Sequence, residues 1–381
     1  MRFALDYTPA LTQGAGIGRY ARSLVSALAR VDQSDTIVLF SHEAPQSGRE
    51  FPRASNIQVR MVPVRRLPIF WHRLHMPLPI ELLTGPIDVF HGTDSTIPPA
   101  RRARRVVTVH DRSFMIHPEC AVPSLAAYLN RVVPRAVRTA DHVIADSHQT
   151  ANDLVERLGV PRERITPIHL GIEPDYHRLQ DTAYLADLSV RYGLRHPLVL
   201  AVGTIEPRKN YARLIEAFAE ARRMPGGPAM LVIAGRKGWL YDDVFAAVER
   251  HSVSDGVRFA QYVSEADLRG LYCAADMLAM PSIYEGFGLP AVEAMALGTP
   301  VICSNGGSLP EVVGDAALIV PPEDVSGLAE ALAQVARDPQ LRQDLIACGL
   351  ARSGMFTWEG AAQAHLAVYR NLTPGAGGAS V

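Results

Sequence analysis

Lysine is almost absent from this sequence. Of 38 basic residues only two are lysines, Lys209 and Lys237, and the formal net charge of the chain is -1. A chain with so little net charge lacks the positive field that nucleic-acid binding uses, so we expect no nucleic-acid partner. Cysteine is scarce as well. The four cysteines lie far apart, without CxxC or metal-ligand spacing, which excludes a disulfide framework or a zinc site and fits a reducing compartment.

Long hydrophobic segments are also missing. No apolar run approaches the roughly 20 residues that span a bilayer, and the first apolar residues turn polar too early for a secretory signal. We therefore expect a cytoplasmic protein, either free or in peripheral contact with the inner face of the membrane. With 381 residues, 48% of them hydrophobic and 20% charged, the chain reads as a soluble globular protein of two domains.

Short apolar runs that end in polar or glycine residues recur along the chain, as buried parallel strands do. They are Phe3–Asp6, Ile37–Ser41, Ile57–Val64, Val89–Gly92, Val106–Asp111 and Val143–Ser147, then Leu198–Gly203, Met230–Gly235, Val257–Tyr262, Ala275–Pro281, Val301–Asn305 and Leu318–Pro321. Amphipathic segments such as 18–30 and 125–139 lie between them. The pattern predicts an α/β protein of two doubly wound Rossmann-like domains, 1–188 and 189–355, joined by a polar linker within 181–196. A terminal helix and a frayed Gly- and Ala-rich tail would fill 356–381.

Residues 282–300 combine two carboxylates, a glycine-rich turn and a helix start. Gly286 and Gly288 let the backbone approach a ligand, and the helix that begins near Pro290 favours an anion at its N-terminus. Glu285 would accept hydrogen bonds from sugar hydroxyls and Glu293 from a ribose diol. The alternatives are a loop charge and a carboxylate that only favours the helix dipole.

The two lysines both follow predicted strands. After the turn at Gly203, Arg208 and Lys209 bring a guanidinium fork and a compact cation to one loop, which suits a diphosphate. A solvated pair of cations is the alternative. Lys237 would face either a nucleotide or solvent. A second glycine turn, 306–307, precedes another helix start at Leu309 and would add a second positive N-terminus.

Two polar sequences in the first half invite a functional interpretation. Residues 14–18 read Gly-x-Gly-x-Gly, but the preceding loop is too long for a dinucleotide fingerprint and the expected acidic residue is missing, so no NAD site or other cofactor is expected. His110 and Asp111 end a predicted strand, where a histidine could orient a substrate hydroxyl or move a proton. A hydrogen-bonded core histidine is the alternative. His91 and Ser147 are weaker candidates.

Several of these motifs together resemble one family. The Glu-x7-Glu spacing of Glu285 and Glu293, with the segments 17–20, 108–111 and 203–210, resembles the retaining glycosyltransferases of the GT-B fold across almost the whole chain. The likeness is strongest to bacterial mannosyltransferases of surface-polysaccharide assembly. It implies transfer of a sugar from a nucleotide-sugar donor, with GDP-mannose the leading expectation, to a hydroxyl of a glycan or lipid-linked acceptor, with retention of configuration. It also implies that the terminal helix packs back on the first domain.

The resemblance assigns roles to residues at matching positions. His110, Asp111, Glu285, Arg208 and Lys209 would carry the chemistry; donor contacts would come from Gly16, Gly203, Arg208, Lys209, Lys237, Val263, Glu285, Gly286, Phe287, Gly288, Leu289 and Glu293. No Asp-x-Asp sequence is present, so no metal is expected. A UDP-sugar transferase, a sugar-nucleotide epimerase of the same fold and a non-catalytic nucleotide-sugar sensor stay open. Segments 60–83 and 101–105 are arginine-rich and would either touch an anionic membrane or acceptor or form a solvated face; the oligomeric state is not set by the sequence.

Overall fold

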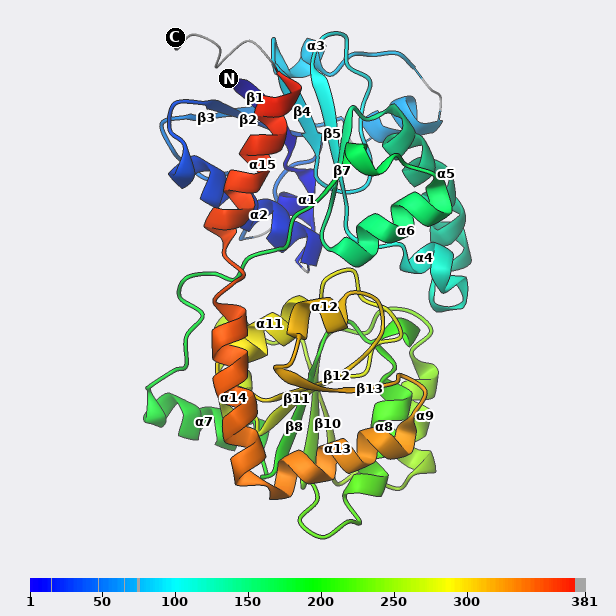
Figure 1. Ribbon diagram of the computed structural model, residues 1–381, viewed down its shortest axis with the longest axis vertical. Helices are drawn as coiled ribbons and strands as arrows, with labels where there is room; N and C mark the ends of the chain where they lie inside the picture. The colour runs from blue at the N-terminus through cyan, green and yellow to red at the C-terminus, as the bar shows by residue number, and fades with distance from the viewer. Residues whose placement is uncertain (15, 47, 65, 74–75, 374–381) are drawn as a thin grey trace. The chain divides into compact units, whose positions relative to one another are not determined.

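The computed structural model describes residues 1–14, 16–46, 48–64, 66–73 and 76–373. The expected frayed end, 374–381, and positions 65 and 74–75 of the segment 60–83 lie outside the described residues. Contacts divide the chain into unit 1 (Met1–Arg112, Ser124–Gly171 and Thr357–Val381) and unit 2 (Ser113–Pro123 and Ile172–Phe356). Each unit holds one parallel sheet with helices around it, which confirms the predicted fold class (Figure 1).

The sheet of unit 1 has the order β3-β2-β1-β4-β5-β6-β7. Its strands are β1 (Arg2–Asp6), β2 (Thr36–Ser41), β3 (Ile57–Met61), β4 (Val89–Gly92), β5 (Arg104–Val109), β6 (His142–Ala145) and β7 (Ile165–Pro167). Six of these match predicted runs, whereas the three-residue β7 was not predicted. The prediction of burial is wrong for β3, because it is an edge strand and four of its five residues are exposed.

Helices of unit 1 connect these strands. They are α1 (Thr8–Thr12), α2 (Gly16–Val31), α3 (Glu81–Thr84), α5 (Pro123–Thr139), α6 (His148–Leu158) and α15 (Trp358–Leu372), with a π-helix at Ile69–Arg73 and a 3-10 turn at Arg162–Arg164. The terminal helix α15 belongs to unit 1, where it runs beside α2 (Figure 1). Among the described residues, no helix has both the length and the apolar character that a membrane crossing requires.

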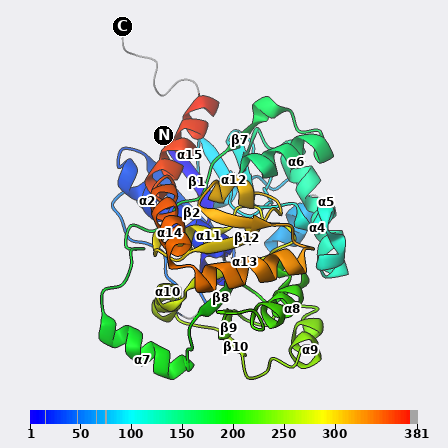
Figure 2. The ribbon, with the colours of Figure 1, turned by 60° about the horizontal axis from the view of Figure 1, so that its bottom comes forward.

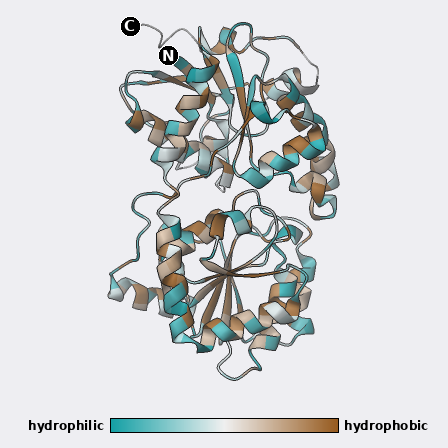
Figure 3. Ribbon diagram, in the orientation of Figure 1, coloured by the Kyte–Doolittle hydropathy of each residue, from teal (hydrophilic) through white to brown (hydrophobic). Residues whose placement is uncertain are grey.

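The sheet of unit 2 has the order β10-β9-β8-β11-β12-β13, and its strands are coloured brown over most of their length in Figure 3, as an apolar core requires. The strands are β8 (Leu198–Val202), β9 (Met230–Ala234), β10 (Val257–Gln261), β11 (Met277–Met280), β12 (Val301–Ser304) and β13 (Ala317–Val320). The helices of unit 2 are α4 (Ser113–Ile116), α7 (Thr182–Tyr192), α8 (Tyr211–Ala221), α9 (Asp242–Arg250), α10 (Glu265–Ala274), α11 (Leu289–Ala296), α12 (Leu309–Val313), α13 (Val325–Arg337) and α14 (Pro339–Ser353), with 3-10 turns at Pro118–Cys120 and Pro207–Lys209. Helices α8 and α13 pack together (Figures 1 and 2).

Two segments of unit 2 differ from the expected domain limits. Ser113–Pro123 makes its contacts within unit 2, where the Trp239 indole donates to the carbonyl of Cys120 at 2.8 Å. The segment 181–196, expected as a linker, contains α7. This helix buries Leu188 completely, and the hydroxyl of Tyr184 donates to Asp267 of α10 at 2.8 Å. These contacts are long-range, so the local polarity of the segment did not indicate them.

Candidate active site

Two loops of unit 2 are brought together by neighbouring strands. β8 pairs with β11 in parallel, so the turn Pro207–Lys209 after β8 and the loop 281–288 after β11 leave the sheet at the same edge. The backbone N–H of Ile283 donates to the carbonyl of Arg208 at 2.8 Å, and the Arg208 guanidinium donates to the carbonyl of Tyr284 at 2.8 Å. The loop that carries the two cations is thereby fixed to the loop that carries Glu285.

The side chains of these loops form a buried cluster of alternating charges. Lys209 Nζ lies 2.7 Å from Glu285 Oε1, and Arg208 Nη1 lies 2.8 Å from Glu285 Oε2. Arg208 Nη2 also lies 2.7 Å from Glu206 Oε1. Burial alone would raise the pKa of Glu285, but the charges of Arg208 and Lys209 outweigh it and lower that pKa to about 2. Both cations are therefore held in place by carboxylates rather than solvated, and Glu206 is a member that the sequence analysis did not single out.

Glycines shape the backbone around this cluster. Gly203 has φ of +144°, and a Cβ there would lie 3.1 Å from Lys209 Cε. Gly307 has φ of +66°, and a Cβ there would lie 2.3 Å from the carbonyl oxygen of Glu285, which also accepts from the backbone N–H of Ser308 at 2.9 Å. Only glycine allows the backbone at position 307 to come this close, so the 306–307 turn packs against the main chain of Glu285 and holds it in place. The helix α12 that follows this turn has only five residues, Leu309–Val313.

The predicted helix start is observed at α11. Gly288, with φ of +102°, immediately precedes Leu289, the first residue of the helix, and its carbonyl oxygen accepts from the backbone N–H of Ala291 at 2.9 Å. Gly286 and Phe287 are buried in the same loop, and the ring of Phe287 lies edge-on to Phe356 at 5.6 Å. The loop is thus anchored in the core of unit 2 and presents an N-terminus suited to an anion.

Glu293 lies inside α11 and is only 3% exposed. The hydroxyl of Tyr272 donates to its Oε2 at 2.6 Å. The sequence analysis predicted that this carboxylate contacts a ribose. In the structure one of its partners is the buried phenol of Tyr272, and this contact between α10 and α11 could not be predicted from the local sequence.

The remaining donor-side candidates lie after β9 and β10. Lys237 Nζ sits over the rings of Phe245 at 4.4 Å and Tyr241 at 5.1 Å, so its charge contacts aromatic faces as well as solvent. Val263 is partly exposed and follows Tyr262, whose ring carries the Arg236 guanidinium at 4.4 Å. The structure places neither Lys237 nor Val263 in the charged cluster.

In unit 1, His110 and Asp111 follow β5. His110 Nδ1 lies 2.7 Å from Asp146 Oδ2 and Nε2 lies 2.9 Å from the carbonyl oxygen of Thr93. Burial would lower the pKa of His110, but the charge and hydrogen bond of Asp146 raise it to about 9. Burial also raises the pKa of Asp146 itself, against the opposing charge of His110. The contact with Asp146 therefore favours the charged form of His110.

Asp146 was missed by the sequence analysis, although a signal existed. It follows a buried strand directly, as His110 does, and so met the same criterion of a polar residue at a strand end. Gly16, by contrast, begins α2 and is exposed, and a Cβ there would meet nothing within 4 Å. No described part of the protein therefore packs so closely against Gly16 that a side chain there would clash.

The weaker candidates His91 and Ser147 have structural partners. Ser147 caps α6 by accepting from the backbone N–H of Thr150 at 3.0 Å. His91 is fully buried, with Nδ1 2.6 Å from the Tyr369 hydroxyl of α15 and Nε2 2.7 Å from the Thr108 hydroxyl. These contacts hold α15 on the sheet.

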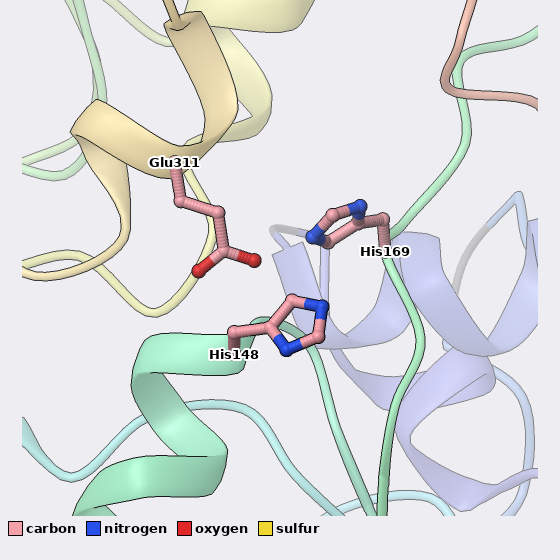
Figure 4. Close-up of side chains that lie close together, drawn as sticks. All are labelled: His148, His169 and Glu311. Atoms are coloured by element: carbon pink, nitrogen blue, oxygen red, sulfur yellow. The ribbon is translucent and has the colours of Figure 1, made fainter.

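Two further histidines of unit 1, His148 at the start of α6 and His169 after β7, have ring centroids 5.9 Å apart in an edge-on arrangement (Figure 4). Glu311, drawn in the same figure, belongs to unit 2.

Comparison with known proteins agrees with this arrangement. Residues 14–176 match the family model Glycosyltransferase Family 4, and residues 192–350 match the model Glycosyl transferases group 1. The chain is 32% identical over 370 residues to O-antigen chain mannosyltransferase B of Escherichia coli, covering 94% of this chain and 96% of that protein. The chain belongs to the GT-B glycosyltransferases. The predicted resemblance to bacterial mannosyltransferases is thereby confirmed.

Other GT-B relatives are similar over different extents. The serotype-specific mannosyltransferase WbdA of Escherichia coli is 29% identical over 245 residues, which is 63% of this chain but 29% of that longer protein. Among solved structures, sucrose-phosphate synthase from Thermosynechococcus elongatus has a TM-score of 0.76 at 23% identity, covering 98% of this chain and 99% of that one. WaaG, a glycosyltransferase involved in lipopolysaccharide biosynthesis, has a TM-score of 0.73 at 17% identity, covering 98% and 100%. The two structures support the fold alone.

Proposed function

We propose that this GT-B glycosyltransferase is a retaining mannosyltransferase that moves mannose from GDP-mannose to a hydroxyl of a glycan or lipid-linked acceptor in surface-polysaccharide synthesis. The observation that carries the proposal is the near full-length similarity to O-antigen chain mannosyltransferase B. The Arg208, Lys209 and Glu285 cluster beside the α11 N-terminus supports it, because a departing diphosphate needs fixed cations and backbone N–H groups.

The chemistry follows from these groups. In the proposed step, the acceptor oxygen forms a bond to the anomeric carbon while the bond from that carbon to the β-phosphate oxygen breaks. The acceptor proton passes to the departing phosphate oxygen on the same face of the sugar. Arg208 and Lys209 stabilise the charge that develops on the diphosphate, and Glu285 keeps both cations ordered before the donor arrives, so little reorganisation is needed.

A panel of donors tests the proposal. We expect GDP-mannose to raise the melting temperature of the full chain and to yield a mannosylated product with a cell-derived lipid acceptor. The anomeric coupling of that product reports retention or inversion. Binding at a hundred times Kd would add about 2.7 kcal/mol to the stability of the native state, a shift that thermal melting detects. Stabilisation and transfer with UDP-sugars alone would replace the GDP proposal, and an inverted product would exclude retention.

A peripheral membrane contact is part of this proposal. Val59 and Met61 of the edge strand β3 are 38% and 46% exposed and flank the exposed Arg60, and Phe70 is also exposed nearby in the chain. Apolar side chains among arginines suit an anionic lipid surface. In contrast, Arg104 of the segment 101–105 is paired with Asp141 at 3.2 Å.

We expect the wild-type chain to float with phosphatidylglycerol vesicles at low salt and not with phosphatidylcholine vesicles. Replacing Arg60 and Arg66 with serine removes two exposed cations, each worth about 1 kcal/mol near an anionic surface, and should weaken vesicle binding about 30-fold. Replacing Arg222 and Arg250 of unit 2 with serine is the matched control. Absence of wild-type co-flotation would contradict the membrane contact.

A further inference from the structure

Three neighbouring strands of unit 1 end around one histidine. In the parallel register Val109 of β5 lies opposite Ala145 of β6, so the next residues, His110 and Asp146, leave the sheet side by side. Gly92 of β4 pairs with Val107 of β5, so Thr93 leaves the sheet on the other side of β5, and its carbonyl oxygen lies 2.9 Å from His110 Nε2. The register sets the Asp146 partner of His110, and the course of the chain after β4 brings Thr93 to the ring.

Both partners of His110 are acceptors. While it is ionised, the carboxylate of Asp146, 2.7 Å from Nδ1, has no proton to donate, and the carbonyl oxygen of Thr93, 2.9 Å from Nε2, never has one. Each short contact is satisfied only if the ring nitrogen carries a hydrogen. His110 therefore donates from both nitrogens and is an imidazolium, with no lone pair left to accept a proton from a substrate.

The surroundings keep this ring in place. Tyr20 of α2 packs edge-on against His110, with centroids 4.9 Å apart. Its hydroxyl is in turn 2.9 Å from Thr108 Oγ1 and 2.9 Å from His365 Nε2 of α15. The titratable groups that face His110 are Asp146, Asp94, Tyr20 and His91. Asp146 is the one of these that contacts the ring nitrogens, and its side chain is 3% exposed.

We propose that Asp146 is a positioning residue of the transferase, which keeps His110 a doubly donating, fixed positive charge at the end of β5, so that His110 does not act as the base for the acceptor hydroxyl. This inference rests on the proposed function for its effect on transfer. If His110 is not the base, the proton of the acceptor hydroxyl goes to another group, in agreement with its transfer to the departing phosphate oxygen. Asp146 then sets the charge and the orientation of the His110 ring.

The pH profile of Asp146→Asn tests the proposal. Asparagine is nearly isosteric but neutral, so His110 should return to its ordinary pKa of 6.5 or lower. With a pKa of 6.5 about three quarters of the ring is charged at pH 6 and about 3% at pH 8, so the ratio of variant to wild-type kcat should fall about 25-fold over this interval. Asp141→Asn, at the opposite end of β6, where the carboxylate is paired with Arg104 rather than with a histidine, should keep a flat ratio.

A spectroscopic readout separates this inference from the proposed function. The ring ¹⁵N and ¹³C shifts of His110 in the full-length wild type, assigned with His110→Gln, should report an imidazolium at pH 8 and a neutral ring at the same pH in Asp146→Asn. A neutral His110 in the wild type at pH 8 overturns the inference, whether or not the variant folds. Transfer by Asp146→Asn with a wild-type pH profile also overturns it. If the wild type transfers sugar from none of the donors, the proposed function is wrong. The chemical shifts of the His110 ring would still show whether Asp146 keeps it charged.

Discussion

Replacing Lys209 with methionine is expected to slow glycosyl transfer about 10²- to 10³-fold, the usual effect of removing one donor aimed at developing negative charge. Methionine keeps most of the aliphatic volume of lysine but cannot stabilise a departing diphosphate. The loss should appear in kcat at saturating donor, because the charge on the diphosphate grows as the sugar leaves. Steady-state kinetics with GDP-mannose and a lipid-linked acceptor measures it.

The same variant should remain folded. Glu285 loses its 2.7 Å contact with Lys209 but keeps its contact with Arg208 at 2.8 Å, so its charge is not left unpaired. Arg222→Met, which removes a cation from an ion pair on the surface of unit 2, is the matched control and should transfer at the wild-type rate. A wild-type kcat for Lys209→Met would remove the phosphate role of this lysine.

The fold was largely predictable because the strands are short, apolar and separated by helices of clear amphipathic period. β4 matches its predicted limits, and the observed Leu198–Val202 and Met230–Ala234 differ from prediction by one residue. The edge position of β3 was not predictable from its composition, since an exposed edge and a buried centre can use the same β-branched and apolar residues. Strand order decides exposure, and strand order is a long-range property.

The candidate site was predictable in its residues more than in its contacts. Arg208, Lys209 and Glu285 were selected for their residue types at strand ends, yet Lys209 pairs with a residue 76 positions away in the sequence. The same limit hid Asp146, because its partnership with His110 depends on the β5 and β6 register. A search for polar residues at strand ends finds members of a site, but only the register shows which of them neutralise one another.

Replacing Glu285 with glutamine is expected to lower the stability of unit 2 at neutral pH by about 3 kcal/mol, since it leaves two largely buried cations without their shared anion. For a unit of this size that corresponds to roughly 6 to 12 °C in melting temperature. The pKa of Glu285 is lowered from 4.5 to about 2. Its contribution is therefore complete above pH 4.5 and is lost as the pH falls from 4.5 towards 2.

The difference in melting temperature between wild type and Glu285→Gln should thus be largest at pH 6 to 8 and should shrink towards pH 3, which calorimetry across pH measures. Glu249→Gln, an exposed carboxylate on α9, should show no such difference at any pH. A difference that stays constant down to pH 3 would mean that lost packing, rather than lost charge, destabilises the variant. In that case Glu285 would not be the anion that orders Arg208 and Lys209, and the preorganised diphosphate site would have to rest on the α11 N-terminus alone.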